Sequence, residues 1–248
     1  MRETASPLRT VDAVVLDTDG VITDSARLHA QAWKAVFDAF LREQPPDSAA
    51  DLRPFAIDVD YPLYVDGKSR RDGAAAFLAA RGMRAAPETV EAVARDKDRH
   101  FTERLRQGAP VPAYPGTVDL LRALRAAGRP AAAVSASLHA RELLTRARVI
   151  GFFDAVVDGK EAADLGLRGK PAPDLFLEAA RRLGVAPARA AVVEDALAGV
   201  EAGHNGRFGL VIGVDRTAGR ERAGDLLRHG ADLVVPDLSE LLVKGAVT

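Results

Sequence analysis

The sequence predicts an α/β protein, with a mostly parallel sheet covered by helices on both faces and an α-helical cap inserted into it. Short β-branched runs alternate with helical periodicity along most of the chain, which is the pattern of a doubly wound parallel sheet. The alternation fails directly after the first expected strand, where helical and loop-like segments follow one another without a strand. An insertion at that point accounts for the interruption.

Six segments have the pattern of buried strands, and they are 12–17, 130–135, 155–158, 190–194, 208–214 and 233–235. Helical signals fill the stretches between most of them. A helix within 115–130 is expected to end at Gly128. Another, over 172–185, is expected to take Asp174 as its N-cap and to end at Gly184.

The predicted cap spans residues 25–111, and the predicted core domain consists of 1–24 and 112–248. Residues 42–62 of the cap are loop-like, and Gly and Pro cluster over 107–116, where the chain would return to the core. Helical periodicity within the cap covers 26–43, 70–82 and 87–107.

Composition limits the kinds of partner. The 248 residues include 34 Lys and Arg against 35 Asp and Glu, for a net charge of −1, without a basic stripe or an acidic tail. We therefore expect neither nucleic acid nor a membrane as partner. There is no cysteine and no apolar stretch of signal-peptide or membrane-span length. These features are those of a cytoplasmic protein, which we expect to be a monomer.

Polar residues follow several of the expected strands. Ligands of open parallel sheets bind beyond the carboxyl ends of the strands, so groups at these exits are expected to meet. The groups concerned are Asp17, Asp19, Ser135, the backbone of Ala136, Lys170, Glu194 and Asp195. Together they suit phosphoryl transfer through an aspartyl phosphate, in which a carboxylate nucleophile divides one difficult displacement into two steps.

Neighbouring carboxylates and an incoming phosphoryl group would repel one another without a cation between them. Mg²⁺ prefers oxygen ligands and would be held by Asp17, Glu194 and Asp195. Lys170 and the Ser135 hydroxyl would neutralise the phosphoryl oxygens from the other side. The sequence therefore predicts a small phosphorylated substrate and Mg²⁺ as cofactor.

Asp19, two residues after the nucleophile, is placed to exchange a proton with the substrate oxygen. Each of these residues also has a simpler explanation when taken alone. Ser135 and Ser137 could cap a helix, Lys170 could be a solvated loop lysine, and the acids after 190–193 could favour a helix N-terminus. Their occurrence together at successive strand exits favours a shared site.

Five motifs, "LDTDGVITDS", "YPG", "VSAS", "GKPAPD" and "VVEDALAGV", occur in the order and spacing of the haloacid dehalogenase superfamily of aspartate-nucleophile phosphotransferases, which the chain resembles along nearly all its length. The resemblance implies a Rossmann-like core with a helical cap inserted after the first strand. It also implies that Asp17 is the nucleophile and Asp19 the general acid/base. Mg²⁺ would then bind Asp17, the carbonyl of Asp19, Glu194 and Asp195.

A narrower resemblance, to the β-phosphoglucomutase-like subfamily, rests on "DGVITDSARLHAQAWK", "VDGKSRRDG" and "RDKDRHF". It implies that Arg70 grips the second phosphate of the substrate and that Lys97 supports the closed cap. It further implies that His29 contacts the acid/base and that Ser25 lies at a hinge. The complete set of substrate-binding residues so implied is Ser25, His29, Trp33, Arg70, Lys97, Ala136, Ser137 and His139.

The cap residues also have simpler explanations: His29 as a packing or surface residue, Arg70 as part of a solvated charged face, and Lys97 as one member of exposed ion pairs. The chain departs from the subfamily in two places. Leu138 and His139 stand where the subfamily has lysine and asparagine, and the asparagine expected after Lys97 is Asp98. The cap loop is also longer than in the compact mutases.

We therefore expect a Mg²⁺-dependent phosphosugar mutase that interconverts β-glucose 1-phosphate and glucose 6-phosphate through an aspartyl phosphate and a bisphosphate. A phosphatase acting on small sugar or nucleotide phosphates remains the alternative, because it would share every core residue. A phospho-accepting signalling module is a third possibility, but it has no use for the cap or for Asp19.

Overall fold

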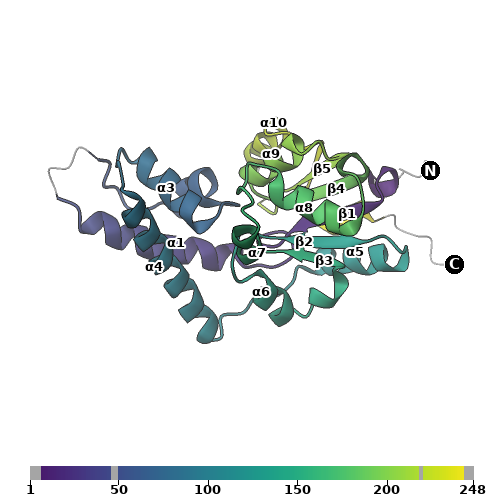
Figure 1. The fold of residues 1–248 in the computed structure, drawn as a ribbon, viewed down its shortest axis with the longest axis horizontal. Coiled ribbons are helices and arrows are strands. Elements are labelled where there is room, and N and C mark those ends of the chain that lie inside the picture. Colours follow the sequence, from purple (N-terminus) through teal and green to yellow (C-terminus); the bar gives the residue numbers. More distant parts are fainter. Residues whose placement is uncertain (1–6, 46–49, 218–219, 243–248) are drawn as a thin grey trace.

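The computed structural model describes residues 7–45, 50–217 and 220–242 (Figure 1). A six-stranded parallel sheet has the order β3-β2-β1-β4-β5-β6. The strands are β1 (Ala13–Asp17), β2 (Ala131–Val134), β3 (Ala155–Val157), β4 (Ala190–Glu194), β5 (Leu210–Val214) and β6 (Leu233–Val235). The α/β fold class is confirmed, and every predicted strand is found with its ends shifted by at most two residues.

Helices cover both faces of this sheet. Successive residues of β1 point to opposite faces, so that Val14 and Leu16 join the buried cluster that contains Leu120 of α5, while Val15 joins the one that contains Phe176 of α8. All five residues of β1 and of β4 are buried for this reason. The core helices are α5 (Pro115–Ala126), α6 (Ala140–Arg146), α7 (Gly159–Asp164), α8 (Asp174–Leu183), α9 (Leu197–Asn205) and α10 (Arg220–Arg228).

The predicted end of α8 is confirmed, but its predicted beginning is wrong by one residue. Gly184 ends the helix with a left-handed φ of 68°. Pro173 is the N-cap, and Asp174 is the first helical residue. The carboxylate of Asp174 accepts hydrogen bonds from the backbone and guanidinium of Arg168 instead of capping the helix, and it still lies in the first turn, where a negative charge is favourable.

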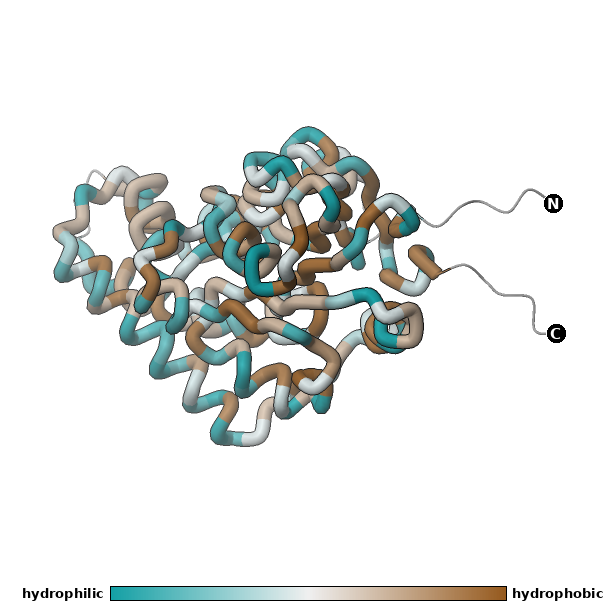
Figure 2. The backbone as a smooth tube through the Cα atoms, turned by 45° about the vertical axis from the view of Figure 1, so that its right-hand side comes forward, coloured by the Kyte–Doolittle hydropathy of each residue, from teal (hydrophilic) through white to brown (hydrophobic). Residues whose placement is uncertain are grey.

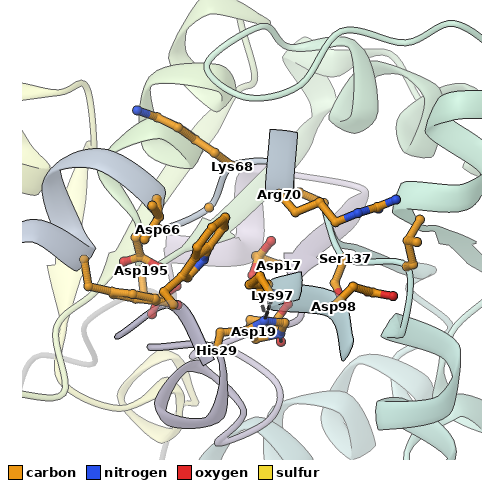
Figure 3. A pocket seen from close by; sticks show the side chains of 16 residues that line it. Asp17, Asp19, His29, Asp66, Lys68, Arg70, Lys97, Asp98, Ser137 and Asp195 are labelled. Atoms are coloured by element: carbon orange, nitrogen blue, oxygen red, sulfur yellow. Dashed lines mark hydrogen bonds and ion pairs between the residues drawn. The ribbon is translucent and has the colours of Figure 1, made fainter. Parts of the chain in front are cut away.

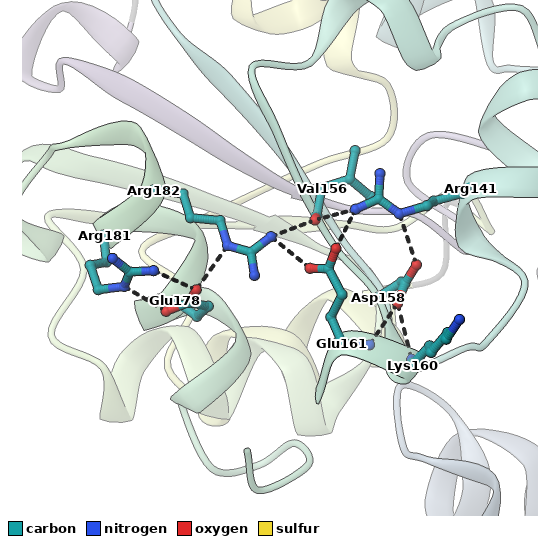
Figure 4. Close-up of polar contacts among 8 residues, drawn as sticks. All are labelled: Arg141, Val156, Asp158, Lys160, Glu161, Glu178, Arg181 and Arg182. Atoms are coloured by element: carbon teal, nitrogen blue, oxygen red, sulfur yellow. Dashed lines mark hydrogen bonds and ion pairs between the residues drawn. The ribbon is translucent and has the colours of Figure 1, made fainter. Parts of the chain in front are cut away.

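The edge strand β3 is covered by arginines from two helices (Figure 4). The carbonyl of Val156 accepts hydrogen bonds from Arg141 of α6 at 3.1 Å and from Arg182 of α8 at 3.2 Å. Both guanidinium groups also pair with Glu161 of α7. Because an uncovered sheet edge can pair with another chain, this network protects the edge as well as linking three helices.

Between β1 and α5 the chain forms α1 (Ala26–Arg42), α2 (Ile57–Asp60), the π-helical turn η2 (Tyr61–Val65), α3 (Arg70–Ala80) and α4 (Pro87–Arg106). The three predicted cap helices are confirmed. The loop prediction for 42–62 is wrong from Ile57 onward, because Asp60 accepts a hydrogen bond from the backbone of Ala56 and closes a helical turn there. Residues 46–49 of that segment lie outside the described residues.

The cap helices have a hydrophobic core of their own. Phe37 of α1 stacks on Trp33 and Phe55 and lies tilted against Phe77 in a buried aromatic group. In Figure 2 hydrophobic and hydrophilic residues alternate along these helices, as expected where one face is buried. No helix in the described ranges is both long enough and apolar enough to cross a bilayer.

Candidate active site

The carboxyl ends of β1, β2 and β4 meet at one edge of the sheet. Asp17 ends β1, Glu194 ends the neighbouring β4, and Ser135 directly follows β2. The ammonium of Lys170, from the loop before α8, donates to both Asp17 and Glu194. The structure thus brings together the strand-end residues that the sequence singled out.

This cluster is almost completely removed from solvent. The side chains of Lys170 and Glu194 are 0% exposed, and that of Asp17 is 6% exposed. Burial, together with the charges of Glu194 and Asp19, raises the pKa of Asp17 well above its usual value, although Lys170 opposes the shift. Burial alone would lower the pKa of Lys170, but the two acids outweigh it and raise that pKa.

Three carboxylates form a group that fits a divalent cation. One oxygen from each of Asp17, Glu194 and Asp195 lies within 4.8 Å of the others. Asp195 Oδ1 is buried without a hydrogen-bond partner, so this oxygen is available as a ligand. Gly20 passes directly beneath it with a φ of +87°, and a Cβ there would come within 1.9 Å of Asp195 Oδ2. An all-oxygen, anionic donor set suits Mg²⁺.

The carboxylate of Asp19 is held by hydrogen-bond donors on several sides. Its backbone N–H donates to Asp17 Oδ2 at 2.9 Å. Ser25 donates to Asp19 Oδ1 at 2.5 Å, and Ser135 donates to Oδ2 at 3.0 Å. Burial would raise the pKa of Asp19, but His29 and the two hydroxyls outweigh it and lower the pKa. Asp19 is therefore an anion in this arrangement.

Two cap residues extend this line of contacts. His29 Nε2 lies 3.2 Å from Asp19 Oδ1, and Lys97 donates to His29 Nδ1 at 2.7 Å. An imidazole that accepts at Nδ1 carries its proton on Nε2, which faces Asp19. Lys97 is only 7% exposed, and its ammonium lies 5.0 Å from the ring centre of Phe101 and 5.5 Å from that of Trp33. Burial lowers its pKa to about 8.

The simpler explanations given above for Lys97 and His29 do not account for their positions. Lys97 is not one member of an exposed ion pair, and His29, also 7% exposed, is not a surface residue. His29 does pack, since its ring stacks on Phe101 at 4.1 Å, but it also contacts the predicted acid/base.

A cavity lies between these groups and the rest of the cap. Arg70, Lys97, Trp33, Ala136 and Ser137 all contribute to its wall. Figure 3 shows Arg70, Ser137 and Asp98 on one side of it, and Asp66 and Asp195 on the other. Arg70 begins α3, and its Nε is buried without a hydrogen-bond partner. Ser137 donates its backbone N–H to Ser135 Oγ at 3.0 Å.

Comparison with known proteins agrees with this geometry. The family described as haloacid dehalogenase-like hydrolase matches residues 11–207. The chain belongs to the haloacid dehalogenase superfamily. A β-phosphoglucomutase of Mycobacterium bovis is 44% identical over 242 residues, covering 94% of this chain and 92% of the relative. One from Bacillus subtilis is 32% identical, covering 94% and 92%.

The fold agrees as well. The crystal structure of β-phosphoglucomutase from Clostridium difficile matches with a TM-score of 0.73 at 24% identity, covering 94% of this chain and 93% of that one. The protein is therefore a phosphotransferase of the haloacid dehalogenase superfamily, in its β-phosphoglucomutase-like subfamily.

The two places where the sequence departs from the subfamily, Leu138-His139 and Asp98, are in contact in the structure. His139 does not line the cavity directly; its Nε2 is 2.9 Å from Asp98 Oδ1, and Asp98 lines the cavity. The hydrogen bond from His139 holds the pKa of Asp98 below its usual value. Leu138 lines the same cavity.

Two polar residues of this haloacid dehalogenase site were not found from the sequence. Arg222 of α10 donates to the carbonyl of Asp195 at 2.6 Å and to Asp66 of the cap at 3.3 Å. Burial and the charge of Glu194 raise the pKa of Asp66 to about 6, against the effect of Arg222. Asp66 lies inside the "VDGKSRRDG" segment and could have been noticed there, whereas no local signal marks Arg222.

Proposed function

We propose that this phosphotransferase is a phosphosugar mutase that interconverts β-glucose 1-phosphate and glucose 6-phosphate. The observation that carries the proposal is the buried line Lys97–His29–Asp19, in which two cap residues complete the surroundings of a core carboxylate. An acid/base whose environment depends on the cap suits an enzyme that transfers phosphate to a bound sugar instead of to water. The 44% identity to a β-phosphoglucomutase supports the same choice.

The proposed reaction starts from Asp17 carrying a phosphoryl group. Asp19, an anion here, takes the proton of the C6 hydroxyl of β-glucose 1-phosphate while that oxygen attacks phosphorus and the bond to Asp17 breaks. The product is glucose 1,6-bisphosphate, which turns around in the site. Asp17 then attacks the C1 phosphate, Asp19 returns its proton to the departing C1 oxygen, and glucose 6-phosphate leaves.

The core residues would lower the barrier by charge. Lys170 donates to Asp17 and Ser135 donates to Asp19, and from these positions they would neutralise phosphoryl oxygens. Asp17, Glu194, Asp195 and the carbonyl of Asp19 would hold Mg²⁺. When bound, that ion would offset the repulsion between the carboxylates and the phosphoryl group.

The cap would close over the bound sugar. We take 25–111 as the cap and 1–24 with 112–248 as the core, with Ser25 at the hinge. The buried, unpartnered Nε of Arg70 would grip the phosphate that is not being transferred, together with Ser137. Trp33, His29, Lys97 and the backbone of Ala136 would surround the sugar and the transferring group.

The test is an assay with β-glucose 1-phosphate and a catalytic amount of glucose 1,6-bisphosphate in the presence of Mg²⁺. The proposal predicts stoichiometric glucose 6-phosphate. Release of inorganic phosphate without glucose 6-phosphate would overturn it in favour of the phosphatase alternative. A parallel screen of sugar 1-phosphates of both anomers identifies the sugar.

A further inference from the structure

The helices α4 of the cap and α6 of the core face each other beside the active site. Phe101 and Leu105 of α4 belong to the same buried apolar cluster as Leu143 of α6. At one end of this contact, Arg146 donates to the carbonyl of Leu105 at 3.1 Å. That end lies next to the linker 107–114, through which the cap returns to the core.

The opposite end of the contact lies at the cavity and is polar. His139, which precedes α6, points its Nε2 at Asp98 Oδ1, and its ring lies 5.2 Å from that of Phe101. Asp98 and Phe101 are one turn apart on the same face of α4, so His139 contacts this helix on two successive turns. The side chains are half-buried, with 18% of His139 and 33% of Asp98 exposed.

We propose that His139 and Asp98 form a clasp between core and cap, which positions α4 so that Lys97 and His29 stay aligned on Asp19. Lys97 immediately precedes Asp98 on the helix, and its ammonium reaches His29 Nδ1. A shift of α4 at Asp98 therefore moves Lys97 as well. His139 acts through these neighbours as a positioning residue.

The position of the clasp along α4 explains why it matters for closure. Asp98 lies eight residues before Arg106, where the helix ends, and so about 12 Å from the linker side. A rotation of the cap about the linker moves Asp98, in the middle of α4, more than Leu105, which lies next to the linker. The His139–Asp98 contact is formed in the structure. On this proposal it is lost when the cap swings away, which lets water approach Asp17.

The experiment compares Asp98→Ala, His139→Ala, His139→Gln and the double variant Asp98→Ala/His139→Ala with the wild type. Asp96→Ala is the matched control, because Asp96 lies on the same helix and pairs with Arg99 on its outer surface. Alanine favours helix, so these changes do not weaken α4 itself. Glutamine keeps an N–H donor for Asp98.

The first measurement is amide hydrogen exchange of residues 93–105 in the substrate-free protein. We expect about tenfold faster exchange in both single alanine variants, which is the change that loss of one charged hydrogen bond produces. The double variant should match the single ones, and His139→Gln and Asp96→Ala should match the wild type. Unchanged exchange, or additive effects in the double variant, would overturn the clasp. If His139→Ala fails to fold, Asp98→Ala alone decides.

The second measurement is the ratio of inorganic phosphate to glucose 6-phosphate in the mutase assay, which a purely structural contact would leave unchanged. We expect this ratio to rise about tenfold in the same variants as water gains access. An unchanged ratio beside faster exchange would refute the positioning role. The product-ratio measurement rests on the proposed function. If the proposed function is wrong, the wild type itself makes no glucose 6-phosphate, whereas the hydrogen-exchange measurement needs no substrate and still tests the clasp.

Discussion

Replacing Lys170 by methionine removes the only ammonium that donates to both Asp17 and Glu194 among the described contacts. Methionine fills a similar volume, so the change is mainly one of charge. All three side chains are nearly or wholly inaccessible to solvent. The variant therefore leaves two adjacent buried carboxylates without a cation.

The size of the effect follows from that burial. Removing one partner of a buried ion pair costs about 3–5 kcal/mol of unfolding free energy. A second route gives an upper limit of similar size: a carboxyl group with an unfolded pKa of about 3.9 that must stay neutral in the folded variant at pH 7 costs about 4 kcal/mol, of which the wild type already carries a part. Burial already raises the pKa of Asp17 in the wild type, and losing Lys170 moves it further in the same direction.

The sign of the pH dependence follows from the raised pKa. The folded state binds the proton more tightly than the unfolded state, so the penalty grows as pH rises above about 3.9 and is absent below it. Between pH 5 and pH 7 the cost should increase, by at most about 2.7 kcal/mol for one carboxyl group.

Urea unfolding without divalent ions, at pH 5 and pH 7, measures this cost directly. Lys160→Met is the control, because Lys160 is exposed on α7 and its loss should change stability by less than about 0.5 kcal/mol. A cost below about 1 kcal/mol at pH 7, or a larger cost at pH 5 than at pH 7, would refute the electrostatic reasoning.

Three further changes test other parts of the site. Arg70→Ala should reduce turnover of the bisphosphate by about 10²–10³-fold and leave hydrolysis of monophosphates nearly unchanged. Arg71→Ala, which removes an exposed partner of Glu91, should leave both activities unchanged. Steady-state kinetics on both substrates tests this. Activity should decline above about pH 8, because the Lys97 ammonium loses its proton as pH rises through its lowered pKa of about 8. Lys97→Arg should move that decline to higher pH. Identical pH profiles for the two proteins would exclude Lys97 as the source of the decline. Arg222→Gln should weaken Mg²⁺ binding about 10- to 100-fold in calorimetry, since Arg222 holds the carbonyl of Asp195, and equal affinities would show that this contact does not support the metal.

The core of the site could be predicted because topology alone determines it. Asp17 and Glu194 end neighbouring parallel strands, in which Leu16 pairs with Val193. The carboxylates of Asp17 and Glu194 must therefore lie close together. Lys170 follows from the same rule less directly, because it lies in a loop well after the expected strand 155–158 and a loop lysine has no periodicity. The strands themselves are short apolar runs with clear limits.

Other features depended on packing that no local pattern contains. Arg222 reaches Asp195 from a helix whose placement over the sheet is a tertiary property. Asp98 and His139 could each be recognised as departures from the subfamily, but they are 41 positions apart in sequence and only the fold shows that they touch. The turn at 57–65 lies among Asp and Pro, which are typical of loops. It is helical in the fold, where Asp60 accepts the backbone N–H of Ala56 and pairs with the distant Arg81, and where Val65 is buried within the cap.

The central claim is that Asp17 itself carries the phosphoryl group, and trapping it tests that claim most directly. The enzyme is mixed with ³²P-labelled glucose 1,6-bisphosphate and Mg²⁺, quenched in acid within one turnover, and digested for peptide mass spectrometry. The proposal predicts label on the peptide that contains Asp17, and neither label nor turnover in a folded Asp17→Asn variant. Label on another residue, or substantial turnover by Asp17→Asn, would contradict it.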